Sequence, residues 1–227
     1  MAEMVITIDG PAASGKSTVA KLLAEKLSAS FLDTGAMYRA VTLAAIEAGV
    51  DMRNEEKLLE IMQTTNFQFS AKEGKMAAYI DRVDVSEKIR QPHITANSRY
   101  IASSAKLRER LVEMQRQFAA SQEKIVTEGR DQGTVAFPDA DIKFYLTADL
   151  SERAKRRQAE LQAKGVNESL DQIQKAIEQR DKSDQNRAVG PLKPASDAIV
   201  IDTTDLSVKE VVEKVLRCVQ EKCLKKG

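Results

Sequence analysis

Several residue types are scarce or missing in this chain of 227 residues. Tryptophan is absent, aromatic residues make up 4%, and His93 is the single histidine. The 35 Lys and Arg residues are nearly balanced by 34 Asp and Glu, so the net charge is only +1. A nucleic-acid-binding module usually has a basic face with aromatic stacking positions. We therefore expect no nucleic acid among the partners.

Long apolar runs are missing too. No stretch approaches the roughly 20 residues that a membrane-spanning helix needs. The first apolar run begins at Met4 and leaves no room for a secretory signal peptide before it. Cys218 and Cys223 lack the spacing of a metal site, so we expect reduced thiols without a role. These absences predict a cytoplasmic protein that contacts no membrane.

The most informative segment that is present spans residues 10–17, Gly-Pro-Ala-Ala-Ser-Gly-Lys-Ser. It matches G-x-x-x-x-G-K-[ST], a loop whose backbone N–H groups surround phosphates while Lys reaches the outer phosphates and Ser can ligate Mg²⁺. The apolar run 4–8 before it predicts a buried strand, and residues 18–27 after it have helical apolar spacing. This strand, loop and helix predict that the chain binds nucleotide phosphates.

Short apolar runs alternate with helix-like segments through most of the chain. The runs lie at residues 4–8, 31–32, 125–126, 142–146 and 198–201. This alternation predicts an α/β fold, with a parallel five-stranded sheet and helices on both faces. The last helix begins at a capping box of Ser207 and Glu210 and carries an apolar stripe from Val208 to Val219.

Residues 67–89 show a different pattern. Apolar runs at 67–69, 76–80 and 83–85 are separated by turn signals, the first of them Lys72-Glu73-Gly74-Lys75. Such runs predict short antiparallel strands with no helix between them. We therefore assign a small β insertion to residues 61–99, within a core formed by residues 1–60 and 100–227.

Three further clusters combine Arg or Asp with a predicted turn, at residues 32–39, 128–134 and 180–187. A fourth, at residues 152–157, is the basic start of a helix. In open α/β sheets, ligands bind at the carboxyl ends of the strands. Each cluster alone would commonly be a solvated or locally paired surface. Their occurrence together with a phosphate-binding loop favours a second anion site.

These motifs resemble bacterial cytidylate kinases, of the P-loop nucleoside monophosphate kinase family. The resemblance rests on 33–39 (Asp-Thr-Gly-Ala-Met-Tyr-Arg), Gly129-Arg130-Asp131, Arg180-Asp181 with Asp184 and Arg187, and Asp197-Ala198. The family implies phosphoryl transfer from ATP to CMP or dCMP in pyrimidine metabolism, giving ADP and CDP or dCDP, with Mg²⁺ as cofactor. It implies that the insertion binds the monophosphate and that about 150–167 form a helical lid. We expect a monomer.

The resemblance also implies roles for individual residues. The ATP-binding residues are Gly10, Pro11, Ala12, Ala13, Ser14, Gly15, Lys16, Ser17 and Thr18, with Ser17 as Mg²⁺ ligand and Asp33 a possible ligand through water. The catalytic residues are Lys16, Arg130, Arg187, Arg153 and Arg157, the last two in the lid. The CMP-binding residues are Thr34, Arg39, Ser98, Arg108, Arg130, Asp131, Arg180, Asp184 and Arg187.

Elementary chemistry agrees with these roles. A nucleotide phosphate is already largely dianionic near neutral pH, so no strong general base is needed and His93 can be solvated or structural. The planar fork of Arg suits phosphate oxygens. A carboxylate such as Asp131 can accept from the cytosine N4 amine, which uracil lacks, so a preference for C over U has a physical source.

Some residues depart from the pattern or keep a second interpretation. Glu128 stands where these kinases usually have Asp, and residues 81–84 stand where a Gly-containing turn is typical. The spacing from Ser98 to Arg108 is one residue longer than the family pattern, so Asn97 or Ser103 could replace Ser98. Asp33 could instead cap the helix after it. Asp9 has the same two interpretations, contact with a metal-bound water or a capping role. The arginines at 153, 156 and 157 could form an exposed basic face paired with the acidic residues at 152 and 160.

Two other functions fit the phosphate-binding loop. One is a P-loop kinase of another small acceptor, such as UMP or shikimate. The other is a regulatory GTPase, since residues 181–184, Asp-Lys-Ser-Asp, resemble the guanine-reading N/T-K-x-D element. That element normally follows a buried strand, whereas residues 181–184 end an amphipathic segment, so the GTPase is the weaker alternative.

Overall fold

The computed structural model describes residues 2–72, 75–163 and 165–224. The expected turn at Glu73-Gly74 and the thiol of Cys223 lie outside the described part. The chain divides into two compact units, one formed by residues 24–127 with the first residues of the chain, the other by residues 5–23 and 128–227.

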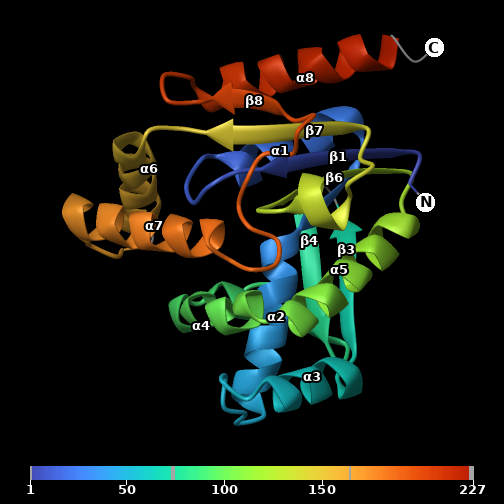
Figure 1. The fold of residues 1–227 in the computed structure, drawn as a ribbon, viewed down its shortest axis with the longest axis vertical. Coiled ribbons are helices and arrows are strands. Elements are labelled where there is room, and N and C mark those ends of the chain that lie inside the picture. Colours follow the sequence, from blue (N-terminus) through green and yellow to red (C-terminus); the bar gives the residue numbers. More distant parts are fainter. Residues whose placement is uncertain (1, 73–74, 164, 225–227) are drawn as a thin grey trace. The chain divides into compact units, whose positions relative to one another are not determined.

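Five strands form a sheet with the order β2-β6-β1-β7-β8 (Figure 1). They are β1 (Met4–Asp9), β2 (Ser30–Asp33), β6 (Lys124–Gly129), β7 (Ile142–Thr147) and β8 (Ile199–Asp202). β1 pairs with β7 in parallel from Ile6↔Ile142 to Asp9↔Tyr145, and β7 pairs in parallel with β8. The predicted five-stranded parallel sheet is confirmed.

The unit containing β7 and β8 also holds η2 (Gln132–Ala136) and the helices α6 (Leu150–Gln162), α7 (Leu170–Gln185) and α8 (Val208–Leu224), together with the first part of α1 (Lys16–Leu27). The loop after β1 leads into α1, and the loop after β7 leads into α6. Because β1 and β7 are parallel, both loops leave the same edge of the sheet. This edge is where ligands of such sheets bind.

The capping box predicted for the last helix is present. The Ser207 N–H donates to Glu210 Oε2 at 2.8 Å, and the Glu210 N–H donates to Ser207 Oγ at 3.3 Å. The predicted stripe is buried at Val211, Val215 and Val219, and α8 lies along β7 (Figure 1).

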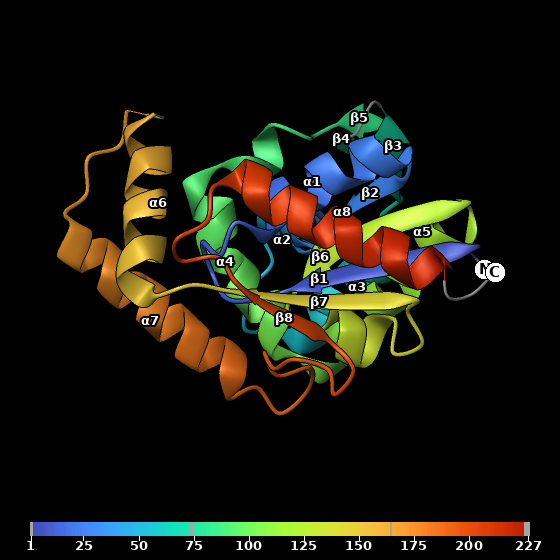
Figure 2. The ribbon, with the colours of Figure 1, turned by 90° about the horizontal axis from the view of Figure 1, so that it is seen from above.

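The helices α6 and α7 lie side by side, at the carboxyl end of β7 (Figure 2). A small apolar cluster joins them to the phosphate-binding loop, with Ala154 from α6, Ile173 and Ile177 from α7, and Ala12 from the loop. Residues 181–184 lie within α7 rather than after a strand, which removes the structural context that a GTPase would need.

The other unit contains α2 (Thr34–Glu47), α3 (Glu55–Thr64), η1 (Lys88–Arg90), α4 (Pro92–Ser103) and α5 (Ala105–Ala120). It also holds an antiparallel sheet of β3 (Phe67–Lys72), β4 (Lys75–Ile80) and β5 (Val83–Asp84), as the insertion's pattern predicted. Between β4 and β5, Asp81 and Arg82 have φ of 49° and 69°, the left-handed values that a two-residue I′ turn needs. The turn at Asp81-Arg82 therefore forms without the glycine that we described as typical at this place.

Candidate active site

The phosphate-binding loop joins β1 to α1 and lies against β7. A Cβ built on Gly10 would lie 2.2 Å from the backbone oxygen of Leu146, so only glycine allows this approach. Lys16 is buried, and its Nζ donates to the Pro11 carbonyl at 3.0 Å. Ser17 and Thr18 are exposed in the first turn of α1. A helix N-terminus with a buried lysine beside it is suited to bind phosphate.

The charge of Lys16 depends on its neighbours. Burial lowers the pKa of Lys16, and the positive charges of Arg130 and Arg180 lower it further, against the opposing effects of Glu128 and Asp184. A phosphate bound beside Lys16 would favour its charged form. The lysine and the arginines therefore form a site that gains from an incoming polyanion.

Asp9, at the end of β1, connects this loop to the turn after β6. Its carboxylate accepts from the Gln132 N–H at 2.9 Å and from the Gly133 N–H at 2.8 Å. Burial raises the pKa of Asp9 to about 7, although both backbone hydrogen bonds act in the opposite direction. Asp9 is thus tied to the segment that directly follows Arg130 and Asp131.

A carboxylate joins two of the predicted arginines. Arg130 Nε donates to Asp184 Oδ2 at 2.8 Å, and Arg187 NH2 lies 3.8 Å from Asp184 Oδ1. Burial disfavours the charged form of Arg130, but Asp184 and then Glu128 outweigh it and raise the pKa of Arg130. Burial acts to raise the pKa of Asp184, but the positive charges of Arg130 and then Arg187 have the larger combined effect, so the pKa of Asp184 is lowered. The structure thus brings together three residues that the sequence places up to 57 positions apart.

The remaining predicted residues of this unit lie around that cluster. Asp131 is buried, and its carbonyl accepts from the N–H groups of Val135 and Ala136. Glu128 is buried, whereas Arg180 is exposed on α7.

In the other unit, Asp33 caps α2 and holds two arginines. Its Oδ1 accepts from the Ala36 N–H at 3.0 Å, which confirms the capping interpretation. Its Oδ2 accepts from Arg39 at 3.0 Å and lies 3.7 Å from Arg90, which sequence reasoning missed. Thr34 is buried at the start of α2. Among the described residues, the buried Nε of Arg39 has no hydrogen-bond partner, which is typical of a group that binds a ligand.

Arg108, on α5, is buried at 3% exposure. Its guanidinium lies over the ring of Tyr38, 5.7 Å from the centroid, and NH1 donates weakly to the Ala102 carbonyl at 3.4 Å. Attraction between the cation and the ring helps to keep the guanidinium at this place.

The hydroxyl of Ser98 donates to the Thr95 carbonyl at 2.8 Å, within α4. Asn97 and Ser103, the alternatives to Ser98, also donate to carbonyls of their own helix, at 2.9 Å each. These bonds do not single out one of the three. His93 is exposed at the start of α4.

The three arginines of α6 have different environments. Arg153 is buried at 8% exposure and bonds to Asp181 and to the backbone of Ala12. Arg156 bonds to Glu152 and to Thr203. Arg157 NH1 donates to Glu160 Oε2 at 2.9 Å, and its side chain is 41% exposed. The interpretation as an exposed basic face therefore fits Arg157 but not Arg153.

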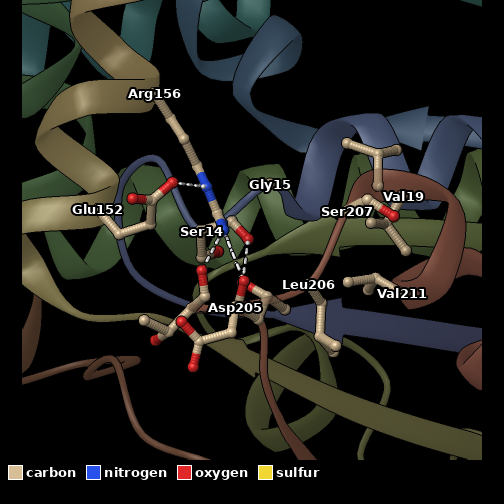
Figure 3. A pocket seen from close by; sticks show the side chains of 12 residues that line it. Ser14, Gly15, Val19, Glu152, Arg156, Asp205, Leu206, Ser207 and Val211 are labelled. Atoms are coloured by element: carbon tan, nitrogen blue, oxygen red, sulfur yellow. Dashed lines mark hydrogen bonds and ion pairs between the residues drawn. The ribbon is translucent and has the colours of Figure 1, made fainter.

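A cavity of about 430 Å³ borders the phosphate-binding loop (Figure 3). Arg156 reaches across it, and its NH1 donates to Thr203 Oγ1 at 3.0 Å. The lining residues are Ser14, Gly15, Val19, Glu152, Arg156, Thr203, Thr204, Asp205, Leu206, Ser207, Val208 and Val211. Sequence reasoning missed this cavity, because its walls come from three distant segments. The local signal in the sequence was that residues 203–207 link the last strand to the last helix.

Among residues 2–72, 75–163 and 165–224, no group of three or more His, Cys, Asp or Glu side chains could hold a metal ion. Ser17, the predicted Mg²⁺ ligand, is exposed in the first turn of α1. In the same described ranges, no helix is both long and apolar enough to span a bilayer.

Comparisons with known proteins identify the family. Residues 6–221 match the family model described as cytidylate kinase. A cytidylate kinase of Bacillus cytotoxicus is 45% identical over 216 residues, covering 95% of this chain and 96% of the relative. A cytidylate kinase of Bacillus thuringiensis is 46% identical, covering 93% of each. The crystal structure of TT1252 from Thermus thermophilus, 15% identical, has a TM-score of 0.52 over 98% of each chain and shares the fold. The chain belongs to the cytidylate kinase family.

Proposed function

We propose that this protein transfers the γ-phosphoryl group of ATP to CMP or dCMP, giving ADP and CDP or dCDP. The family model and the relatives support this proposal, and one observation carries it beyond phosphate binding alone. Arg130 and Arg187 are held on Asp184, and the charge of Arg130 acts on the buried Lys16. A phosphate-binding loop that only held ATP would not need this second group of cations.

The donor nucleotide is assigned to the loop and its cavity. Residues 10–18 would surround the phosphates, and the cavity of about 430 Å³ is of a size that suits the nucleoside half. Its walls include Val19, Leu206 and Val211 for apolar contact, with Arg156 and Thr203 as polar groups. Ser17 would ligate Mg²⁺, which when bound neutralises part of the phosphate charge.

Nine residues are proposed to bind the acceptor nucleotide. Thr34, Arg39, Arg130 and Arg187 would bind its phosphate, Arg180 and Asp184 its sugar, and Ser98, Arg108 and Asp131 its base. The buried Nε of Arg39 supports an anion at that residue. The burial of Asp131 supports base recognition, because a desolvated carboxylate discriminates strongly between an amine donor and an oxygen acceptor.

The chemical step needs positioning and charge neutralisation rather than a strong base. An oxygen of the acceptor phosphate forms a bond to the γ-phosphorus as the bond to the bridging oxygen of ADP breaks. Lys16, Arg130 and Arg187 would neutralise the charge that develops, and Arg157 would do so from the lid at about 150–167. The insertion at 61–99 would bind the monophosphate.

We further propose that the enzyme works as a monomer in the cytoplasm in pyrimidine metabolism, with no nucleic-acid or membrane partner. The near-zero net charge and the absence of tryptophan support the exclusion of nucleic acid.

A coupled ADP-release assay tests the proposed function. The acceptors are CMP, dCMP, UMP, AMP, GMP and shikimate, each with ATP and Mg²⁺, and Lys16→Met serves as the inactive control. We expect CMP and dCMP to be phosphorylated, UMP more weakly, and the others hardly at all. Absence of CMP-dependent ADP release would overturn the proposal, and faster release with shikimate would support the alternative kinase.

A further inference from the structure

A buried ion pair holds both polar groups of Ala12 in the phosphate-binding loop. The Ala12 N–H donates to Asp181 Oδ1 at 3.0 Å, and the Ala12 carbonyl accepts from Arg153 NH1 at 3.0 Å. Arg153 NH1 also donates to Asp181 Oδ2 at 2.5 Å, and Arg153 Nε donates to the Ala148 carbonyl at 2.9 Å. One residue of the loop is therefore held from α6 and from α7 at once.

We propose that Arg153 and Asp181 are positioning residues, which hold the loop at Ala12-Ala13 in the conformation that binds ATP. This inference rests on the proposed function, since it concerns the donor site of that reaction. It gives Arg153 a different role from contact with the transferring phosphoryl group, the role that the family resemblance implies. Arg153 donates hydrogen bonds to the carbonyls of Ala148 and Ala12 and to the carboxylate of Asp181, all of them groups of the protein itself.

The conformation of Ala13 explains why the loop needs such a restraint. Ala13 has φ of 59°, in the left-handed region that costs free energy for any residue except glycine. A strained residue keeps this conformation only where its surroundings fix it. The peptide unit between Ala12 and Ala13 carries the carbonyl that Arg153 holds, so the restraint acts directly before the strained residue.

The burial of the pair gives the restraint its strength. Arg153 is 8% exposed and Asp181 is 7% exposed, beside the apolar cluster of Ala12, Ala154 and Ile173. Exposed ion pairs contribute little, whereas hydrogen bonds to a desolvated charge are strong. Removal of Arg153 alone would leave the Asp181 charge buried without its partner, so a test must neutralise both residues.

The test compares two double variants on the same helix pair. Arg153→Met/Asp181→Asn removes both charges, and Lys175→Met/Asp171→Asn removes an exposed pair of α7 as the control. ATP affinity is measured with Mg²⁺ by calorimetry in the absence of CMP, and CMP affinity is measured separately. We expect the first variant to bind ATP about 10-fold or more weakly, from the loss of charged hydrogen bonds, with CMP affinity within about twofold. The control should match the wild type.

A third substitution separates positioning from general destabilisation. Ala13→Gly relieves the left-handed strain, so in the Arg153→Met/Asp181→Asn background it should recover at least about threefold in ATP affinity. If the double variant does not fold, Arg153→Lys is measured instead; it keeps the charge and loses the planar fork, and the same pattern is expected.

Two results would overturn the proposal. A fall in kcat with unchanged ATP affinity would mean that Arg153 acts on the transferring group itself. A parallel loss of ATP and CMP affinity and of the unfolding midpoint, with no recovery from Ala13→Gly, would mean a purely structural pair. Failure of the proposed function would appear separately, as absence of CMP-dependent ADP release by the wild type.

Discussion

Substitution of Gly10 by alanine is a sharp test of how β7 supports the phosphate-binding loop. The added Cβ would lie 2.2 Å from the backbone oxygen of Leu146 and 3.0 Å from Ser14 Oγ. The oxygen of Leu146 belongs to a strand that is paired with β8 at Ile201, so it has little freedom to move away. The loop itself must therefore shift.

The size of that shift follows from the contact distance. Real Cβ atoms essentially never lie closer than 3.0 Å to such an atom, so a displacement of at least about 0.8 Å is needed from the 2.2 Å starting distance. Misplacement of a reacting group by about 1 Å can cost about 100-fold in rate. Overpacking against a rigid neighbour costs about 1–3 kcal/mol of stability. We expect kcat/KM for ATP to fall about 100-fold in Gly10→Ala.

Gly49→Ala is the matched control. Gly49 has φ of +67°, but a Cβ there would meet nothing within 4 Å. Only the left-handed strain remains, which should lower the unfolding free energy by about 1–2 kcal/mol. We expect no change in kcat/KM for ATP. Steady-state kinetics and urea unfolding of both variants give the comparison. The reasoning fails if Gly10→Ala keeps wild-type ATP kinetics, or if the two variants lose the same stability and nothing else.

Two further predictions concern buried carboxylates, and both use single substitutions. The pKa of Asp9 is raised by burial to about 7 in the folded protein from its usual value of 3.8, so the folded state retains a proton that the unfolded chain releases between these values. Its contribution to the unfolding free energy is therefore greatest below about pH 4 and falls as pH rises toward 7, by about 4 kcal/mol at most. Urea unfolding of the wild type relative to Asp9→Asn should show this slope, and a difference that does not change with pH would contradict it. Asp131→Ala should raise the KM for CMP about 10-fold or more, with ATP affinity within about twofold; an unchanged KM for CMP would remove Asp131 from base recognition.

Local patterns explain what could be predicted from sequence. The apolar runs at 4–8 and 142–146 became β1 and β7 because buried parallel strands need continuous apolar residues. Ser207 and Glu210 identified the start of α8 because a capping box lies within four residues. The phosphate-binding loop was identifiable for the same reason, since its whole mechanism lies in eight consecutive residues.

Distant contacts explain what could not be predicted. Arg153 bonds to Ala12 across 141 positions of the chain, so nothing around Arg153 in the sequence distinguishes it from the exposed Arg157. Arg90 joins Asp33 from a short helix far along the chain, and no spacing rule connects them. The cavity crossed by Arg156 has the same origin, because its walls assemble only when the sheet forms.

The acceptor dependence of ADP release by the purified wild-type protein, with ATP and Mg²⁺, tests the proposed kinase activity most directly. We expect rapid release with CMP and dCMP, slower release with UMP, and release near the acceptor-free background with AMP, GMP and shikimate. A rate with CMP that equals the acceptor-free background would rule out this activity.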